Sequence, residues 1–327
     1  MRRVGNLWHE VVGFDNLCRA ARNAARAKHA THCVARFLER LEPQVLLLQR
    51  ELETGRYRPG VPFEFEILDP KPRVISAAPF RDRVVHHALI DVCEPHFDRR
   101  MIAESFACRR GKGTHKALAH AQRMVRRFAW FLKLDVKSFF PSLEPAVVLE
   151  TLARVIKDRR VLALCATILG NDPGLPIGAL TSQWFANLVL DRLDHHVKEV
   201  LRVESYVRYM DDMVLFADQK ARLQGALPLV EGFLHEHLHL RLKERATQLA
   251  PVRVGLPFLG FHVFRGTMRV RPENLRRSKA RIRARQRQHQ RHEIDESQLA
   301  DAVRSVIAHL EHGTTRALRR RWFANIE

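Results

Sequence analysis

The order of apolar and polar positions predicts helices at the start of the chain, followed by a strand pair and another helix. Over residues 14–54 apolar side chains recur at helical spacing, and Gly55 is suited to end such a segment. Residues 63–68 alternate between apolar and acidic side chains, and the alternation resumes at 73–76 after two prolines, which predicts two strands joined by a turn. Residues 82–97 place their apolar side chains on one face and predict a helix.

The middle of the chain mixes both periodicities. Helices are predicted over 145–169, 181–201 and 227–238, and strands over 130–135, 206–209, 213–216 and 261–264. The second and third of these strands flank a tight hairpin, while everything after Gly266 looks helical and basic. We therefore expect an α+β fold in three parts: an N-terminal helical extension (1–60), a mixed unit (61–265) and a basic helical unit (266–327).

Composition favours a globular protein with a polyanionic partner. The 327 residues include 56 Lys and Arg against 36 Asp and Glu, a net charge of +20, and 46% are hydrophobic, which is enough for a core. No apolar run approaches the ~20 residues of a membrane helix, and the N-terminus lacks the apolar stretch of a secretory signal. Five cysteines without a C-x-x-C pair indicate reduced thiols. We expect a cytoplasmic protein without a membrane partner.

Three acidic residues carry the candidate chemistry. Asp135 ends an apolar strand, and Asp211 and Asp212 occupy the hairpin tip. Nucleotidyl transfer by the two-metal route needs carboxylates that hold two Mg²⁺ ions ~4 Å apart. Mg²⁺ prefers such hard oxygen ligands, and clustered acids repel one another unless cations lie between them. Aspartates also favour turns for purely local reasons, so the surrounding residues must decide between the two interpretations.

Those surroundings carry a family resemblance. Tyr209-Met210-Asp211-Asp212, between two apolar strands, resembles the Tyr-x-Asp-Asp box of reverse transcriptases. Residues 134–141, which read LDVKSFFP, resemble the first acidic box of the same family, and the two boxes stand in the family's order. The resemblance implies a right-hand polymerase fold, with fingers and palm over 61–265 and a thumb over 266–327.

The resemblance also implies roles for the acids. Asp135, Asp211 and Asp212 would be catalytic and would hold two Mg²⁺ ions, with Mn²⁺ as a substitute and the carbonyl of Val136 as a further ligand. Phe140 stands where the family places a bulky aromatic residue beneath the incoming sugar, which excludes a ribose 2′-hydroxyl and favours dNTPs. A simple core aromatic is the alternative for Phe140.

Further segments resemble nucleotide-binding and nucleic-acid-binding parts of the family. Lys71 and Arg73 lie in a segment like the fingers hairpin, where a guanidinium can bind triphosphate oxygens; for Lys71 a solvated surface base is the alternative. Arg109 and Lys112 lie in a stretch like the one along the template, where cations meet phosphates. Phe258, Leu259 and Gly260 resemble the family's primer grip, the hairpin that holds the primer 3′ end.

Two departures from the family pattern narrow the class. Ile177 replaces the usual glutamine before Gly178, and Gln183 replaces the usual proline after Ser182. The usual glutamine supports the nucleotide beside the templating base, and a lost paired contact is worth ~1–3 kcal/mol of discrimination, so we expect lower fidelity. The variant resembles the reverse transcriptases of diversity-generating retroelements, which copy template RNA with frequent errors opposite adenine for mutagenic retrohoming.

That class implies template RNA, an RNA–cDNA duplex, dNTPs and a small basic accessory protein as partners, in a bacterial, phage or archaeal host cell. A reverse transcriptase of a retron, a group II intron or a phage-defence system is one alternative. A noncatalytic RNA-binding scaffold that has kept the fold is another. The general acid for pyrophosphate stays unassigned, because Ala246 stands where many relatives have lysine.

A run of cations near the C-terminus predicts contact with a duplex. Its members are Arg276, Arg277, Lys279, Arg281, Arg283, Arg285, Arg287 and Arg291, with no acid among residues 276–291. A helix bearing them would repel itself without a polyanion, whereas along a template–primer duplex it would follow the phosphates. The string H-E-x-x-H at 235–239 matches zinc proteases, but no third ligand is evident, so we expect a solvated helix end.

Overall fold

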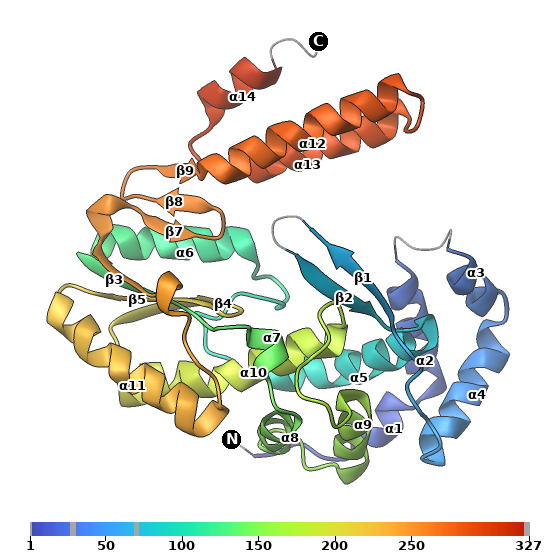
Figure 1. Ribbon diagram of the computed structural model, residues 1–327. Coiled ribbons are helices and arrows are strands. Elements are labelled where there is room, and N and C mark those ends of the chain that lie inside the picture. Colours follow the sequence, from blue (N-terminus) through green and yellow to red (C-terminus); the bar gives the residue numbers. More distant parts are fainter. Residues whose placement is uncertain (1, 27–30, 69–71, 324–327) are drawn as a thin grey trace.

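The computed structural model describes residues 2–26, 31–68 and 72–323. Its N-terminal helices are α1 (Trp8–Val11), α2 (Phe14–Ala25), α3 (His32–Glu39) and α4 (Leu41–Glu53). They lie beside the long helix α5 (Phe80–Asp98), against which α2 packs along its length (Figure 1). The predicted helical stretch is confirmed within the described residues but is divided. Arg26 ends α2 with φ −52° and ψ 130°, and Arg40 separates α3 from α4 with φ −118° and ψ 41°.

A two-stranded hairpin precedes α5. It consists of β1 (Phe63–Ile67) and β2 (Arg73–Ala77), which pair antiparallel as their alternating pattern predicts. The hairpin stands apart from the other sheets and points towards the C-terminal helices in Figure 1. Its base is held to the rest of the chain by the Ser76 N–H, which donates to the carbonyl of Ile177 at 3.0 Å.

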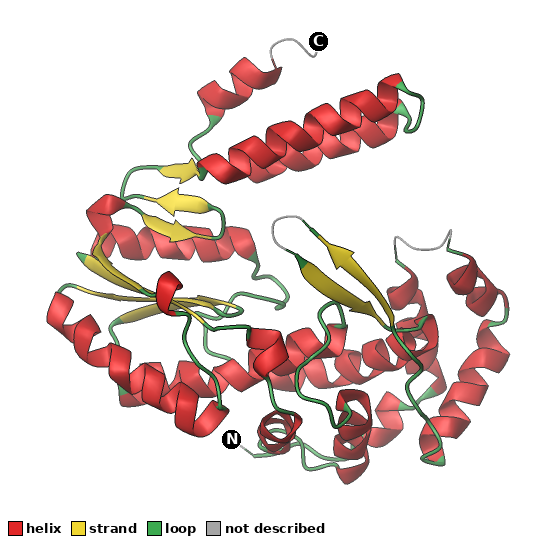
Figure 2. Ribbon diagram, in the orientation of Figure 1, coloured by secondary structure: helices red, strands yellow, loops and turns green. Residues whose placement is uncertain are grey.

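A four-stranded antiparallel sheet forms the centre, in the order β4-β5-β3-β6. Its strands are β3 (Trp130–Asp135), β4 (Ser205–Tyr209), β5 (Asp212–Ala217) and β6 (Gln248–Pro251). Side chains alternate between its faces, so Leu132 and Leu215 join the core with the helices on one side while Phe131 and Phe216 join a second core on the other. Figure 2 shows helices on both faces of this sheet.

The helices around the sheet come from the parts of the chain that precede, connect and follow its strands. They are α6 (Thr114–Arg127), α7 (Phe139–Ser142), α8 (Pro145–Ala153), α9 (Arg159–Leu169), α10 (Leu180–His195) and α11 (Lys220–Leu238). The single helix predicted over 181–201 changes to a π-helical turn at His196–Val200. α11 begins seven residues earlier than predicted and contains Pro228, because Leu223 and Val230 bury its apolar face against the sheet.

The C-terminal part contains a strand that the sequence did not predict. The third sheet has the order β7-β8-β9, with strands Leu256–Phe258, Phe261–Val263 and Met268–Val270. The expectation of only helices after Gly266 is therefore wrong for β9, which pairs with β8 across the proposed boundary at 265/266. Three residues carry too little periodicity to predict a strand, and pairing with β8 decides it.

Three helices complete the chain: α12 (Pro272–Gln290), α13 (Glu296–Glu311) and α14 (Arg316–Phe323). α12 and α13 lie side by side above the central sheet, across from the β1–β2 hairpin (Figure 1). No helix within the described residues is both long and apolar enough to cross a membrane. All five cysteines are unpaired, as expected from their spacing.

Candidate active site

The strand register brings the three predicted acids to one edge of the central sheet. Asp135, the last residue of β3, lies directly opposite Asp212, the first residue of β5, and Asp211 precedes Asp212 in the β4–β5 turn. Residues opposite each other in an antiparallel pair have Cα atoms about 4.5–5.5 Å apart. The two boxes that are distant along the chain therefore meet through the β3–β5 pairing.

The turn that carries Asp211 has only two residues between its strands. Tyr209 pairs with Asp212, so Met210 and Asp211 form the tip, and Met210 adopts the left-handed conformation with φ 54°. Arg208 donates from Nη1 to the carbonyl of Met210 at 3.2 Å. This bond holds the strained residue that directly precedes the first aspartate of the pair.

Arg208 itself is fully buried and uses all its donors. Its Nε and Nη2 bind the Asp194 carboxylate of α10 at 2.7 and 2.5 Å. Nη1 donates to Asn187 Oδ1 at 2.6 Å and Nη2 to the Asn187 carbonyl at 3.2 Å. Burial alone would lower the pKa of Arg208, but the Asp194 carboxylate outweighs it and holds that pKa above its usual value. The β4–β5 turn is thereby anchored to α10.

A lysine also enters the site. Lys133 lies two residues before Asp135 on β3, so both side chains project from the same face, and its Nζ forms an ion pair with Asp212. Sequence reasoning missed both Lys133 and Arg208. The available signal was a charged residue inside an otherwise apolar strand, which is rare unless that residue is paired.

The acids carry more negative charge than their neighbours neutralise. Burial raises the pKa of Asp212 to about 6, although the Lys133 ammonium opposes this, and Asp135 and Asp211 raise it further. Burial and then Asp135 raise the pKa of Asp211, while Arg73 and Lys133 lower it. A bound cation would relieve this repulsion, which is the electrostatic condition for a metal site.

The carboxylates suit Mg²⁺ chemically but are not yet gathered around one point. Within the described ranges no three His, Cys, Asp or Glu side chains are arranged to hold a metal ion. The carboxylate of Asp212 instead forms an ion pair with Lys133. The H-E-x-x-H string at 235–239 is likewise not part of such a group, and His239 Nδ1 lies 2.9 Å from Glu144 Oε2.

The backbone after Asp135 is held by residues 241–243. The Asp135 carbonyl accepts from the Lys243 N–H, and the Lys137 N–H donates to the Arg241 carbonyl, both at 2.8 Å. Val136 stands between these two bonds and pairs with Leu242 in an isolated bridge. The bridge does not use the Val136 carbonyl, the predicted backbone ligand.

Of the predicted nucleotide-binding residues, Arg73 is the described one with an interaction with the acids. Lys71 falls outside the described residues. Arg73 begins β2, is exposed and lies close enough to Asp211 to lower its pKa. Phe139 is buried in the core, whereas Phe140 is only half-buried. The two rings pack edge-on against each other, with centroids 5.5 Å apart. Phe140 therefore packs at the margin of the core, and its ring is partly exposed.

The variant box lies between the hairpin and the catalytic turn. Ile177 accepts from Ser76 of β2 through its carbonyl, and Gln183 Oε1 accepts from Cys108 Sγ at 3.4 Å. Cys108 Sγ is also 3.9 Å from the sulfur of Met210. The start of α10, the segment before α6 and the catalytic turn therefore meet at one thiol.

Arg109 does not have the role predicted for it. Its side chain is 6% exposed and pairs with Asp98 at 2.5 Å. It also donates to the carbonyls of Ile102 and Ser105 at 2.5 and 3.0 Å. These contacts hold the loop before α6 in place. Because the guanidinium is buried and bonded within the chain, it is not available to a phosphate, contrary to the prediction. Lys112 is half-buried, with Nζ 2.6 Å from the Ala103 carbonyl.

The predicted primer grip is a tight turn between β7 and β8. Leu259 and Gly260 both have positive φ, 45° and 88°, as a two-residue hairpin turn requires. Phe258 is buried in the second core, so its side chain cannot contact a primer, contrary to the prediction. The Gly260 carbonyl accepts from Asn274 Nδ2 at 3.0 Å, which joins this turn to α12.

The predicted cations of α12 are mostly exposed. Arg276, Lys279, Arg281, Arg283 and Arg287 are exposed, and Arg277 and Arg285 are half-buried. Ile282 is the buried residue of the helix, which packs on α13. Four of the exposed cations follow one another at spacings of three and four residues and so form one stripe along the helix.

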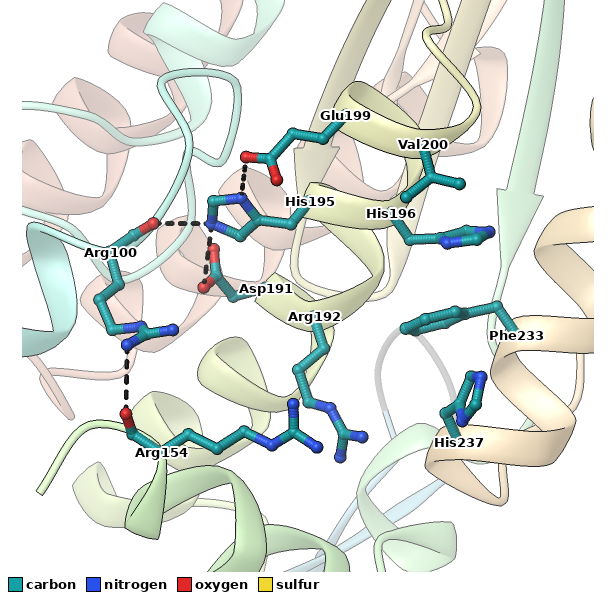
Figure 3. A pocket seen from close by; sticks show the side chains of 10 residues that line it. All are labelled: Arg100, Arg154, Asp191, Arg192, His195, His196, Glu199, Val200, Phe233 and His237. Carbon is teal, nitrogen blue, oxygen red and sulfur yellow. Dashed lines mark hydrogen bonds and ion pairs between the residues drawn. The ribbon is translucent and has the colours of Figure 1, made fainter. Parts of the chain in front are cut away.

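A separate cavity lies between the end of α10, the π-helical turn after it and α11, and none of the three acids lines it. Its volume is about 660 Å³, and Arg100, Asp191 and His195 contribute to one wall while Phe233 lies on the other (Figure 3). His195 binds the Arg100 carbonyl through Nε2 and Glu199 through Nδ1, at 3.0 and 2.6 Å. Burial, followed by Asp194, raises the pKa of Asp191 to about 7.

These features define a template-directed nucleic-acid polymerase domain. The chain belongs to the family described as reverse transcriptase (RNA-dependent DNA polymerase), whose model matches residues 69–263. The fold is the right-hand polymerase fold. A solved apo telomerase from Candida tropicalis, truncated from its C-terminal domain, superposes with TM-score 0.52 at 11% identity, covering 64% of this chain and 55% of that one.

Curated relatives agree with this family. Nuclear intron maturase 1, mitochondrial, of Arabidopsis thaliana is 34% identical over 111 residues, 29% of this chain and 16% of the relative. Protein YkfC of Escherichia coli (strain K12) is 25% identical over 286 residues, 71% of this chain and 75% of YkfC. The match thus spans about a sixth of the maturase and three quarters of YkfC.

Replacing Arg208 by Gln should lower the free energy of unfolding by about 3–5 kcal/mol, because it leaves the Asp194 carboxylate buried without its partner. Urea unfolding measures the loss. The control is Arg154→Gln, which breaks the half-exposed pair with Glu150 and should cost less than about 1 kcal/mol. Equal losses in the two variants would contradict the anchoring role of Arg208.

The Asp191→Asn variant should gain stability relative to the wild type as the pH rises from 4.5 to 7.5. The pKa of Asp191 is about 7 in the folded chain against 3.8 for an ordinary Asp. Between these values the unfolded state ionises first, so the wild type loses stability as pH rises, by about 3 kcal/mol from pH 4.5 to 7.5, whereas Asn does not titrate. Urea unfolding at both pH values tests this, with Asp301→Asn as the exposed control. A pH-independent difference would refute the buried, protonated carboxyl.

Proposed function

We propose that the protein is an RNA-directed DNA polymerase that copies template RNA into cDNA from dNTPs. The observation that carries the proposal is the β3–β5 register, which sets Asp135 opposite Asp212 and beside Asp211 at one sheet edge. These acids lie within a reverse transcriptase domain. Burial and their mutual repulsion raise the pKa values of Asp211 and Asp212, and bound cations would relieve that repulsion.

In this proposal Asp135, Asp211 and Asp212 hold two divalent ions, Mg²⁺ or in its place Mn²⁺, with the Val136 carbonyl as a further ligand. The ions supply activation of the primer 3′-hydroxyl and neutralisation of the triphosphate. For Asp212 to take part, its ion pair with Lys133 must open or be shared.

The remaining residues orient the nucleotide. Arg73, which lies near Asp211, binds triphosphate oxygens through its exposed guanidinium, and Lys71 is proposed for the same role. Phe140 lies five residues after Asp135 with a partly exposed ring, which would clash with a 2′-hydroxyl and so select dNTPs.

The duplex of template RNA and cDNA is proposed to lie between the sheet edge and α12. The exposed stripe of cations on α12 follows its phosphates, while Leu259 and Gly260 hold the primer end and Lys112 faces the template. Such contacts recognise A-form shape rather than base edges, and their affinity falls steeply with salt.

Within this activity we propose error-prone synthesis of the diversity-generating type, with a small basic accessory protein as partner. Ile177 and Gln183 support this subtype, because an apolar side chain stands where a glutamine would support the nucleotide. An intron-type or retron-type enzyme is the second candidate, and the similarity to an intron maturase favours it.

Primer extension on an RNA template with Mg²⁺ and dNTPs tests the activity. We expect synthesis by the wild type and a loss of about 100-fold or more in Asp211→Asn, because a lost metal ligand costs several kcal/mol in the transition state. RNA binding should be retained in the variant, measured by fluorescence anisotropy. Wild-type RNA binding without dNTP incorporation would favour the scaffold interpretation, and full activity in Asp211→Asn would refute the metal assignment.

Sequencing of the cDNA tests the subtype. The Ile177→Gln variant should lower misincorporation opposite template adenine by about 5-fold or more, the effect of one restored paired contact. Error rates opposite the other three template bases serve as the internal control. Wild-type error rates that are equal at all four bases would count against adenine-selective mutagenesis and leave the intron-type or retron-type candidate.

A further inference from the structure

The cavity beside the end of α10 has a cationic wall. Arg100, Arg154 and Arg192 line it, and they come from three separate parts of the chain: the segment after α5, the residue that follows α8, and α10. Its volume of about 660 Å³ falls in the range of ~300–1,000 Å³ that is typical of small-molecule sites. Three guanidinium groups that border one such volume favour an anionic ligand.

The charge of these arginines is only partly neutralised. Arg154 Nη2 donates to Glu150 Oε1 at 2.6 Å, and Arg192 Nη2 lies 3.7 Å from the same oxygen, so two guanidinium groups share one carboxylate. Arg100 Nη1 donates to the Arg154 carbonyl at 3.2 Å, which carries no net charge (Figure 3). Burial, followed by the nearby Arg154, lowers the pKa of Arg192, although Glu150 opposes this. A bound anion would relieve the repulsion between the two guanidinium groups.

The acid on the rim of the cavity is offset by a histidine. His195 Nδ1 lies 2.6 Å from Glu199, and His195 Nε2 lies 3.0 Å from the Arg100 carbonyl. Both partners accept, so we assign a proton to each ring nitrogen, and the resulting charge balances Glu199. Burial alone would lower the pKa of His195, but the hydrogen bonds with Glu199 and the Arg100 carbonyl outweigh it and raise that pKa. The arginines therefore leave the cavity positive.

The opposite wall is aromatic. Phe233 and His237 of α11 and His196 of the π-helical turn form it. The rings of His196 and Phe233 lie nearly parallel with centroids 4.4 Å apart, and His237 meets Phe233 edge-on at 4.8 Å. Burial, followed by His237, lowers the pKa of His196, which keeps that ring uncharged at neutral pH. The cavity thus has an aromatic side across from Arg100 (Figure 3).

We propose that this cavity binds a free nucleoside triphosphate, with the phosphates at Arg154 and Arg192 and the base towards Phe233. A ligand with one polyanionic end and one flat aromatic end matches both walls. A nucleic-acid strand fits less well, because its phosphates extend along a surface, as the exposed cations of α12 do, whereas here three guanidinium groups border a single cavity. None of the three polymerase acids lines the cavity, so the site goes beyond the proposed polymerase function and does not depend on it.

Isothermal titration calorimetry of the full chain with ATP tests the site, in EDTA and at physiological ionic strength. Without divalent ions the clustered polymerase acids repel a triphosphate, which suppresses binding there. We expect a single ATP per chain. Inorganic triphosphate and adenosine should each bind more weakly, because each lacks one of the two ends. Asp211→Asn should bind ATP as the wild type does.

Variants of the cationic wall should change affinity in opposite directions. Arg154→Gln should weaken ATP binding by about 10-fold, the effect of one charge-assisted hydrogen bond. Glu150→Gln removes the carboxylate that Arg154 and Arg192 share, and it should strengthen ATP binding by about 3-fold, the effect of one half-exposed ion pair released to the ligand. A residue with a purely structural role would not give a gain.

The aromatic wall has its own variant and control. Phe233→Leu should weaken ATP binding by about 3-fold, the effect of one aromatic contact, and should leave the affinity for inorganic triphosphate unchanged. Phe14→Leu alters a partly exposed ring on α2, and Arg304→Gln breaks an exposed ion pair with Asp301 on α13. Both should bind ATP as the wild type does. Urea unfolding without ATP confirms that each variant folds.

Absence of ATP binding by the folded wild type would overturn the proposal, as would equal affinities in Arg154→Gln and Arg304→Gln. Loss of binding in Asp211→Asn would place the nucleotide at the polymerase acids and also overturn it. An RNA oligonucleotide whose affinity falls in Arg154→Gln, while ATP does not bind, would assign the cavity to a strand instead. Absent dNTP incorporation by the wild type would contradict the polymerase proposal alone.

Discussion

The buried pair of Arg208 and Asp194 is the interaction on which the polymerase site depends. It joins the strand before the catalytic turn to α10, and the same guanidinium holds the Met210 carbonyl. The backbone of Arg208 also bonds the loop before α6, through the Glu104 carbonyl and the Phe106 N–H. One residue, through its side chain and its backbone, therefore sets the relative positions of the β4–β5 turn, α10 and the loop. A buried charge can do this because the cost of leaving it unpaired penalises every other arrangement.

The charge distribution of the chain follows from a second constraint. The acids at the sheet edge are partly buried and repel one another, and Lys133 neutralises only part of this. Cations elsewhere gather on surfaces, above all on α12, while the acids of the β1–β2 hairpin lie on one face of it. The result is a concentrated negative site at the sheet edge, with exposed positive charge on Arg73 and along α12.

Local pattern was sufficient for most elements. The strands before Asp135 and around the Asp211–Asp212 tip, and the hairpin ahead of α5, all appear where alternation and turn residues predicted them. α6, β9 and the early start of α11 were missed. A three-residue strand and a proline-containing helix are decided by their packing partners. Arg109 was predicted to contact the template and Phe258 the primer, because each lies in a motif at the expected place in the chain. In the structure both side chains are buried.

By itself, the sequence determined the identity and order of the acidic boxes, the basic character of α12 and the alternation that makes each strand, since these depend on neighbouring residues. Only the tertiary structure decided that Asp135 faces Asp212, that Lys133 engages one of the acids and that Arg208 supports the turn. Those contacts join residues tens of positions apart. Strand register and the pairing of buried charges set them, and neither leaves a periodic trace along the chain.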